Sequence, residues 1–235
     1  MRSVAGRRPP RRLSSASAPG RSGAPASPAP RAAASDRGER LRVGVLSLQG
    51  DFSLHASALE ELGCEPVRVS LPEHLEPALA ALVLPGGEST TMLRLLDSTG
   101  LRAPVERFVR ERPVLATCAG LILLAREADR LPRPPLGVLD VTAERNAWGR
   151  QVHSFSAPVD APAWGADLLG VFIRAPRVTR VGEGVEVIAR YRGEPVGVRQ
   201  GHVVALAFHP ELTPDRRAHA WFLREVVGLQ RTVAS

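Results

Sequence analysis

The chain contains no lysine: all 31 of its basic residues, in 235 positions, are arginine. Schiff-base catalysis within the chain is therefore excluded, because it requires a lysine amine. A Walker-type phosphate loop is excluded too, because its glycines are followed by lysine. Cysteine is scarce, and the spacing of Cys64 and Cys118 fits neither a disulfide framework nor a zinc site. We expect no metal ion and no cofactor.

Long hydrophobic runs are also missing. No stretch approaches the roughly 18 consecutive apolar residues that a membrane-spanning helix needs, whereas the 44% hydrophobic content is enough for a packed core. The N-terminal residues lack the apolar segment of a secretory signal. These absences favour a soluble protein, and the few cysteines favour the reducing cytoplasm.

The net charge of +7 lies in one segment. Residues 1–40 hold nine arginines against Asp36 and Glu39, which leaves 22 basic and 22 acidic residues in positions 41–235. Since that remainder is balanced, it lacks the basic surface that nucleic-acid binding requires. Residues 1–40 are poor in large apolar side chains, and we interpret them as a disordered extension or the product of a start codon placed too far upstream. Their prolines disfavour the amphipathic helix of a mitochondrial transit peptide.

The remaining residues alternate between two kinds of segment. Short apolar segments predict strands at 41–50, 65–70, 79–87 and 113–118, and helical spacing predicts helices at 52–63, 88–100, 101–111 and 119–128. Such alternation predicts a parallel sheet covered on both faces. Further strands are expected at 138–144, 153–159, 170–176, 185–191, 194–200 and 202–212, with a closing helix at 214–228. Gly and Pro turns between these later strands predict several antiparallel pairs.

Cys118 lies between a predicted strand and a predicted helix, in the sequence VLATCAGLIL. A side chain on such a turn projects above the sheet, where the N–H groups and dipole of the following helix lower a thiol pKa and hold an oxyanion. The small residues Ala116, Ala119 and Gly120 suit a tight elbow. Cys118 is therefore a candidate nucleophile, and the alternative is a small buried side chain with no chemical role.

A nucleophilic cysteine needs a base, and among six histidines His209 fits best. It follows a strongly apolar strand, and Glu211 lies two residues on, so that both side chains point to the same side of an extended segment. This arrangement allows a Cys-His-Glu triad, whereas its alternative is a solvated pair at a strand end. We expect surface roles for His55, His74, His153 and His219, and a hairpin turn at His202.

Two glycine-containing loops also follow predicted strands. LPGGEST at 84–90 allows the backbone to approach a ligand closely, although an ordinary turn capped by Ser89 or Thr90 has the same composition. LQGD at 48–51 occupies the same position after the first strand. Because the sites of open α/β sheets lie beyond the carboxyl ends of the strands, these loops and Cys118 are expected to meet there.

The motifs LQGD, PGGEST, TCAG, RNAWGRQ, FIRAP and FHPEL occur in this order. With them, residues 42–228 closely resemble the glutaminase subunits of pyridoxal 5′-phosphate synthase, which are class I, triad-type glutamine amidotransferases. The cysteine elbow and His-Pro-Glu indicate only the superfamily, whereas PGGESTT, RNAWGRQVHSF and FIRAP select this family. The resemblance implies one amidotransferase domain at 41–235, an α/β three-layer sandwich with a mixed, mostly parallel central sheet and a flavodoxin-like core.

The resemblance also implies roles for residues of this chain. Cys118 would attack the amide of L-glutamine, His209 would pass a proton to the departing ammonia, and Glu211 would orient His209. The remaining residues that match the family's motifs are Gly87, Ala119 and Gln49 for the oxyanion, and Gly86, Gly87, Glu88, Arg145, Ile173 and Arg174 for glutamine binding.

The resemblance further implies a partner. The family delivers its ammonia to a synthase subunit that builds pyridoxal 5′-phosphate from ribose 5-phosphate and glyceraldehyde 3-phosphate, in a large hetero-oligomer. Two positions depart from the family: Ala116 replaces a usual glycine, and Trp148 replaces a usual tyrosine. The alternatives are a catalytically impaired regulatory subunit of the same complex and a cysteine-nucleophile hydrolase of esters or lactones.

Overall fold

The computed structural model describes residues 40–50, 52–75, 77–145 and 154–229. Its largest sheet has seven strands in the order β10-β11-β12-β4-β3-β1-β2. Their bounds are β1 Arg42–Leu46, β2 Glu65–Val69, β3 Ala81–Leu84, β4 Val114–Thr117, β10 Glu186–Tyr191, β11 Glu194–Gln200 and β12 Val203–Leu206. Neighbours from β12 to β2 are parallel, and β10 and β11 extend the sheet as antiparallel strands. The central sheet is therefore mixed and mostly parallel.

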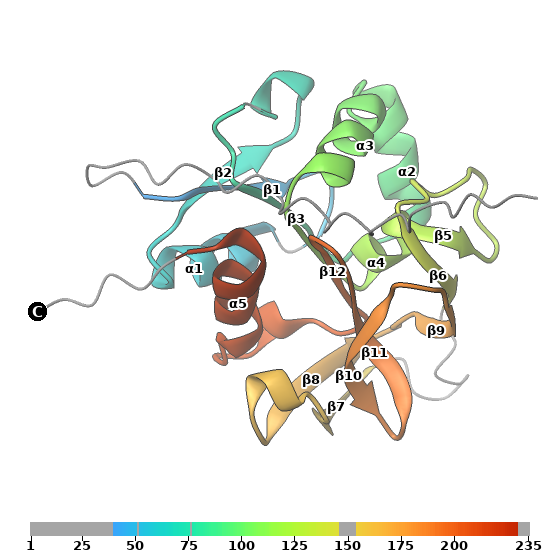
Figure 1. The fold of residues 1–235 in the computed structure, drawn as a ribbon. Coiled ribbons are helices and arrows are strands. Elements are labelled where there is room, and N and C mark those ends of the chain that lie inside the picture. Colours follow the sequence, from blue (N-terminus) through green and yellow to red (C-terminus); the bar gives the residue numbers. More distant parts are fainter. Residues whose placement is uncertain (1–39, 51, 76, 146–153, 230–235) are drawn as a thin grey trace, which may run out of the picture. The chain divides into compact units, whose positions relative to one another are not determined.

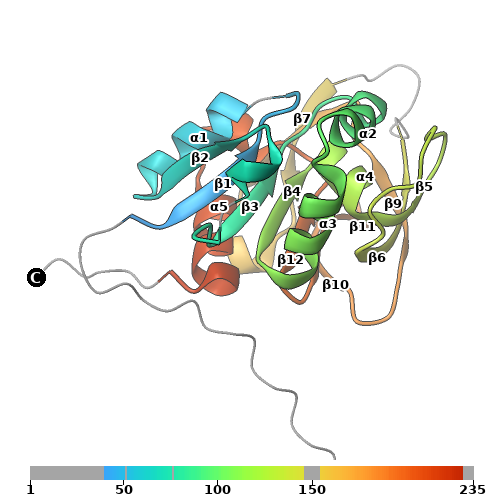
Figure 2. The same cartoon turned by 90° about the horizontal axis from the view of Figure 1, so that it is seen from above.

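Helices cover both faces of this sheet, as Figures 1 and 2 show. One face carries α1 and α5, and the other carries α2, α3 and α4. Their bounds are α1 Phe52–Glu61, α2 Ser89–Ser98, α3 Arg102–Glu111, α4 Ala119–Leu124 and α5 Arg217–Phe222, the last continued by a π-helical turn at Leu223–Val227. The expected three-layer α/β sandwich is confirmed. None of the helices in the described residues is long and apolar enough to cross a membrane.

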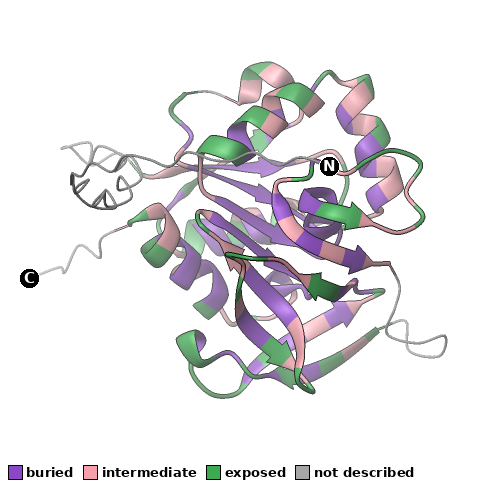
Figure 3. Cartoon of the chain, turned by 45° about the vertical axis from the view of Figure 1, so that its right-hand side comes forward, coloured by how far each residue is buried: buried purple, intermediate pink, exposed green. Residues whose placement is uncertain are grey.

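The burial of the central strands explains why their sequence lacks alternation. Every residue of β3, β4 and β12 is buried, as expected for strands between two helical layers. Figure 3 shows this buried band running through the sheet. Short apolar runs such as VLAT and ALVL are the direct sequence signature of that position.

Two smaller sheets flank the central one. The first contains β5 Ala125–Ala128, β6 Leu139–Glu144 and β9 Arg177–Val181, and the second pairs β7 Ser154–Val159 with β8 Leu168–Ile173. The predicted helix at 119–128 is therefore wrong in its second half, because α4 ends at Leu124 and the next four residues form β5. Pairing with β6 and an ion pair between Arg126 and Asp140 at 2.9 Å hold this segment extended. β9 was not predicted.

Short 3₁₀ turns complete the fold at Pro72–His74 (η1), Pro162–Trp164 (η2) and Pro210–Leu212 (η3). The third ends the segment predicted as a strand at 202–212, since β12 stops at Leu206. Each begins with proline, whose fixed φ suits the first position of a helical turn. The turn η3 contains Pro210 and Glu211 and begins directly after His209, so the His-Pro-Glu sequence lies just beyond a central strand.

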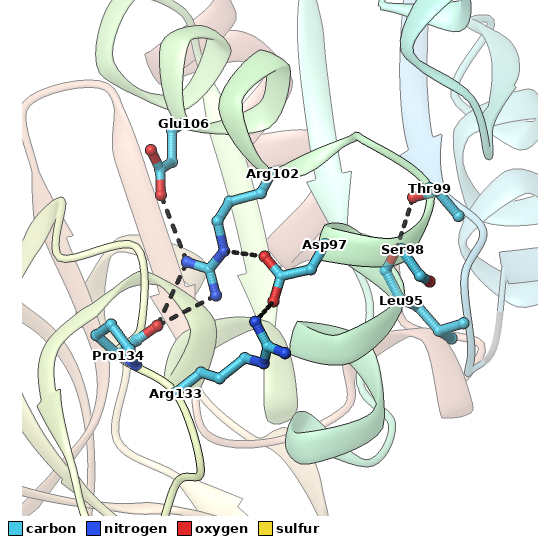
Figure 4. Close-up of polar contacts among 8 residues, drawn as sticks. All are labelled: Leu95, Asp97, Ser98, Thr99, Arg102, Glu106, Arg133 and Pro134. Carbon is cyan, nitrogen blue, oxygen red and sulfur yellow. Dashed lines mark hydrogen bonds and ion pairs between the residues drawn. The ribbon is translucent and has the colours of Figure 1, made fainter.

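A cluster of charged side chains joins α2 and α3 to the loop after β5 (Figure 4). Arg102 contacts Asp97 at 2.6 Å and Glu106 at 3.4 Å, and it donates to the carbonyl of Pro134 at 3.3 Å. Arg133 from the loop contacts the other oxygen of Asp97 at 2.7 Å. The cluster ties together three segments on the helical face that carries α4.

Candidate active site

Cys118 occupies a strained turn between β4 and α4. Its φ of 47° and ψ of −105° lie in a region that non-glycine residues rarely adopt, which costs on the order of 1–3 kcal/mol and is typical of functional positions. Its backbone N–H donates to the carbonyl of Leu206 on β12 at 2.8 Å. At Gly120 an added Cβ would lie 2.2 Å from the carbonyl oxygen of Leu84. Glycine there allows α4 to start directly against β3, so the predicted elbow is present.

Ala116, the position where the sequence analysis noted a departure from glycine, is fully buried in this elbow. It lies in β4 and pairs with Ala205 on β12 and Leu84 on β3. The neighbouring strand therefore offers an equally small side chain at the same level. The second departure, Trp148, lies outside the described residues.

His209 and Glu211 form the contact expected of them. The Nδ1 of His209 lies 2.7 Å from Oε1 of Glu211, and both side chains are almost fully buried. The backbone N–H of His209 donates to the carbonyl of Val171 on β8 at 2.8 Å. His209 is thus held in place through both its ring and its backbone.

The charge state of this pair follows from its surroundings. Burial lowers the pKa of His209, but hydrogen bonding and charge attraction from Cys118 and Glu211 outweigh it and raise the pKa to about 10. Burial alone would raise the pKa of Glu211, yet the nearby His55 and His209 hold it well below its usual value. Near neutral pH the carboxylate is ionised and the imidazole carries a proton, which is the positive charge that a thiolate needs beside it.

The two glycine loops meet beside this pair. An added Cβ at Gly86 would lie 2.3 Å from Cε1 of His209, and one at Gly50 would lie 1.9 Å from the carbonyl oxygen of Gly86. Gln49 accepts a hydrogen bond from the backbone N–H of Glu88 at 3.4 Å. Gly87 has a φ of 151°, a backbone conformation that side chains rarely allow. The loop 86–88 therefore lies against the imidazole through Gly86, and the loop 49–50 packs against the loop 86–88.

Glu88 and Arg145, predicted to bind glutamine, contact each other. The carboxylate of Glu88 accepts from the backbone N–H groups of Thr90 and Thr91 at 3.0 and 2.7 Å, and Arg145 donates to it at 3.0 Å. Burial favours the neutral acid, but the hydrogen bonds from Thr91 and Thr90 prevail and lower the pKa of Glu88 to about 2. Glu88 is thus the N-cap of α2 as well as a charge at the site.

The FIRAP segment reaches the thiol through its backbone. The Sγ of Cys118 donates to the carbonyl oxygen of Ile173 at 3.7 Å. Arg174 follows with an exposed side chain and a positive φ of 44°. Ile173 therefore lies beside Cys118 and Arg174 is the next residue along the chain, whereas the predicted motif residues 146–153 lie outside the described residues.

Two histidines that the sequence assigned to the surface belong to this site, and that prediction is wrong. His55 on α1 and His219 on α5 both have no exposed surface. The Nε2 of His55 lies 3.3 Å from Oε2 of Glu211, and its Nδ1 lies 3.1 Å from Nε2 of His219. A signal was present, because His55 shares a helical face with the buried Ala58 and Leu59.

The arrangement combines a thiol on an elbow, a buried imidazole held by a carboxylate, and a glycine loop with backbone N–H groups beside them. These are the parts of nucleophilic acyl transfer: a nucleophile, a proton carrier with its orienting group, and donors for an oxyanion. Within the described part of the chain, no group of three His, Cys, Asp or Glu side chains is arranged to hold a metal ion.

Comparison with known proteins gives the family. The model of the SNO glutamine amidotransferase family matches residues 45–228. A pyridoxal 5′-phosphate synthase subunit PdxT from Thermotoga neapolitana is 49% identical over 188 residues, which is 79% of this chain and all of that protein. The PdxT subunit of Geobacillus kaustophilus is 48% identical over 187 residues, or 79% of this chain and 95% of that one.

Comparison with solved structures supports the same family. A crystal structure of a glutamine amidotransferase, 50% identical in sequence, superposes with a TM-score of 0.75 over 80% of this chain and 99% of its own. A glutamine amidotransferase from Thermotoga maritima, at 16% identity, has a TM-score of 0.56 over 78% of this chain and 81% of its own, and shows the shared fold alone. The chain belongs to the SNO glutamine amidotransferase family.

Proposed function

We propose that Cys118, His209 and Glu211 form the triad with which this chain, a glutaminase supplying ammonia for pyridoxal 5′-phosphate synthesis, hydrolyses L-glutamine. The observation that carries the proposal is the position of the His209 imidazole. Its Nδ1 is held by Glu211 at 2.7 Å, and its pKa is raised by both Cys118 and Glu211. The thiol itself stands on a strained elbow above the sheet.

The reaction follows from these positions. The sulfur of Cys118 attacks the side-chain amide carbon of glutamine, and the protonated His209 donates its proton to the nitrogen that leaves as ammonia. Water then attacks the γ-glutamyl thioester, with His209 accepting a proton, and glutamate departs. Glu211 remains ionised throughout and fixes the tautomer of His209.

The oxyanion of each tetrahedral intermediate needs N–H donors. We assign the backbone N–H groups of Ala119 and Gly87, since helix geometry leaves the first turn of α4 unpaired and Gly87 lies in the loop against His209. Each such donor is typically worth about 3 kcal/mol in the transition state. Gln49, which accepts a hydrogen bond from the neighbouring Glu88 N–H, holds this loop.

Glutamine also presents an ammonium and a carboxylate. Glu88 supplies an ionised oxygen pair for the ammonium, with the backbone of Gly86 beside it. Arg145, held by Glu88 at 3.0 Å, offers a guanidinium suited to a carboxylate. Ile173 and Arg174 close the site next to the thiol.

The partner is the synthase subunit of the same enzyme, with which this chain forms a hetero-oligomer. The PdxT relatives are named as subunits of pyridoxal 5′-phosphate synthase and match this chain along 95–100% of their own length. Ammonia released into water would be protonated and lost as a nucleophile, so direct transfer into the synthase serves the chemistry.

The test is glutamate release from L-glutamine by the purified full chain, alone and with the synthase subunit of the same organism. We expect turnover that rises on adding the synthase, no turnover in Cys118→Ala, and parent turnover in Cys64→Ala, whose thiol is also buried but lies in the core. Size-exclusion chromatography should show that Cys118→Ala still binds the synthase. Parent-level turnover in Cys118→Ala would refute the triad.

A further inference from the structure

Behind Glu211 lies a line of two buried histidines that the proposed mechanism does not use. His55 comes from α1 and His219 from α5, 164 positions apart in sequence, and neither side chain is exposed. Both helices cover the same face of the sheet (Figure 2). Burying two imidazoles beside an ionised carboxylate is costly unless their hydrogen bonds are well ordered.

The outer histidine, His219, fixes the direction of these hydrogen bonds. Burial lowers the pKa of His219 to about 3, so its ring is neutral and carries one proton. Among the described residues its Nδ1 has no hydrogen-bond partner. A proton placed there would be a buried donor without an acceptor, whereas on Nε2 it is donated to Nδ1 of His55 at 3.1 Å. The proton therefore lies on Nε2 of His219.

This direction determines the tautomer of His55. Because Nδ1 of His55 accepts from His219, the proton of the His55 ring lies on Nε2. That atom is 3.3 Å from Oγ1 of Thr117 and 3.3 Å from Oε2 of Glu211. The contact with Glu211 is close but not aligned as a hydrogen bond, and Oε2 has no aligned partner among the described residues. The aligned partner of the His55 Nε2–H is Oγ1 of Thr117, and a small rotation of the carboxylate would bring Oε2 of Glu211 into line beside it.

We propose that His55 is a positioning residue of the triad, oriented by His219: it holds the second oxygen of Glu211, so that the first stays directed at His209. The inference deepens the proposed function, because it concerns the same triad and rests on that assignment. His55 touches no reacting atom and acts through Glu211.

The groups that face one another along this line are few. Cys118 on the elbow faces His209, Glu211 of η3 faces both His209 and His55, and His219 of α5 faces His55, with the charge of Arg216 acting on it. If the donor on His55 is removed, the Glu211 carboxylate keeps one partner and is free to turn away from His209. The contact between Glu211 and Nδ1 of His209 then weakens, so His209 carries its proton less firmly and the thiolate loses its counterion at a lower pH.

Two substitutions of His55 separate this role from a merely structural one. In His55→Gln the side-chain amide nitrogen reaches the place of Nε2, so a donor to Glu211 is kept. In His55→Asn the amide reaches only the place of Nδ1, so a polar partner for His219 is kept but the donor to Glu211 is lost. Both variants are polar and uncharged, and circular dichroism melting establishes that each is folded.

The measurement is the rate at which iodoacetamide alkylates Cys118 between pH 5 and 10, with the adduct located by mass spectrometry. It requires neither glutamine nor the synthase, so it is independent of turnover. Cys64 is an internal control, because burial raises its pKa to about 11. We expect His55→Gln to react within about threefold of the parent, and His55→Asn about tenfold more slowly at pH 7, which corresponds to a change of about one pKa unit.

Equal rates and pH profiles in the parent and His55→Asn would overturn the proposal, as would equal losses in both variants. If His55→Asn does not fold, His219→Leu replaces it, and about threefold slower alkylation is then expected, because His55 no longer has its orienting donor. A parent-like profile in that variant also overturns the proposal. Slow alkylation of His55→Asn in a chain that hydrolyses no glutamine would leave this inference standing and refute the proposed function instead.

Discussion

Replacing Gly86 by alanine should impair catalysis while leaving the fold intact. The added Cβ would lie 2.3 Å from Cε1 of His209 and 3.1–3.2 Å from both ring nitrogens. Carbon atoms in contact are normally about 3.5–4.0 Å apart, so the methyl or the ring must move by about 1.2 Å. The loop cannot retreat, because the carbonyl of Gly86 is already packed against Gly50. The imidazole has to move instead.

Movement of the ring would disrupt the proposed triad from both sides. His209 is held by Glu211 at 2.7 Å and faces Cys118, and a shift of about 1 Å lengthens one of these contacts beyond hydrogen-bonding range. A misplacement of this size costs on the order of 100-fold in rate, or about 2.7 kcal/mol in the activation barrier. We therefore expect kcat/KM of Gly86→Ala to fall about 100-fold in the presence of the synthase.

The assay is glutamate release over a range of glutamine concentrations, with thermal melting measured alongside. Gly44→Ala is the matched control, because its Cβ would also be crowded, at 3.0 Å from methyl groups of Leu79 and Leu82, but in the core. That variant should lose stability and keep its kcat/KM. Parent activity in Gly86→Ala, or an equal loss of activity in Gly44→Ala, would refute the argument from the imidazole.

Three further predictions follow. Gly120→Ala places a Cβ 2.2 Å from the backbone carbonyl of Leu84, and we expect a loss of about 2 kcal/mol, seen as a fall in Tm of about 4–8 °C. The pKa of His209 is raised to about 10 in the folded chain, so the stabilisation that its proton gives is complete below about pH 6.5 and is lost as the pH rises through 10. The Tm of the parent should therefore fall more between these pH values than the Tm of His209→Asn. Equal falls would contradict this. Removal of residues 2–40 should leave glutaminase activity unchanged, because a relative matched along its whole length has only 188 matched residues, and a large loss would contradict this.

The central sheet was predictable from the sequence because burial on both faces alone determines the apolar pattern of its strands. Strands covered by helices on both faces are apolar throughout, and VLAT, ALVL and VVAL are all fully buried. The boundary at Leu124 was not predictable in this way. The residues AREA favour a helix by intrinsic propensity, and no glycine or proline separates them from α4. They form β5 because β6, which lies later in the chain, offers a pairing edge.

The residues of the candidate site also differ in whether the local sequence predicts them. Cys118, His209 and Glu211 were predictable because each follows a central strand, so that the topology of the sheet brings them together. The Glu88–Arg145 ion pair joins residues 57 positions apart, and only the resemblance to a family pointed to Arg145.

His55 and His219 show that the local sequence can indicate that a side chain is buried without identifying its partner. Each lies on a helical face whose other members are buried, Ala58 and Leu59 for His55, and Phe222 and Leu223 for His219. The spacing therefore indicated that both imidazoles face the core, and a buried imidazole needs a partner. What the spacing does not give is which partner, since α1 and α5 meet only when both pack on one face of the sheet. A histidine at a buried helical position is thus best treated as half of an unidentified pair, and for His55 the other half is the carboxylate of Glu211.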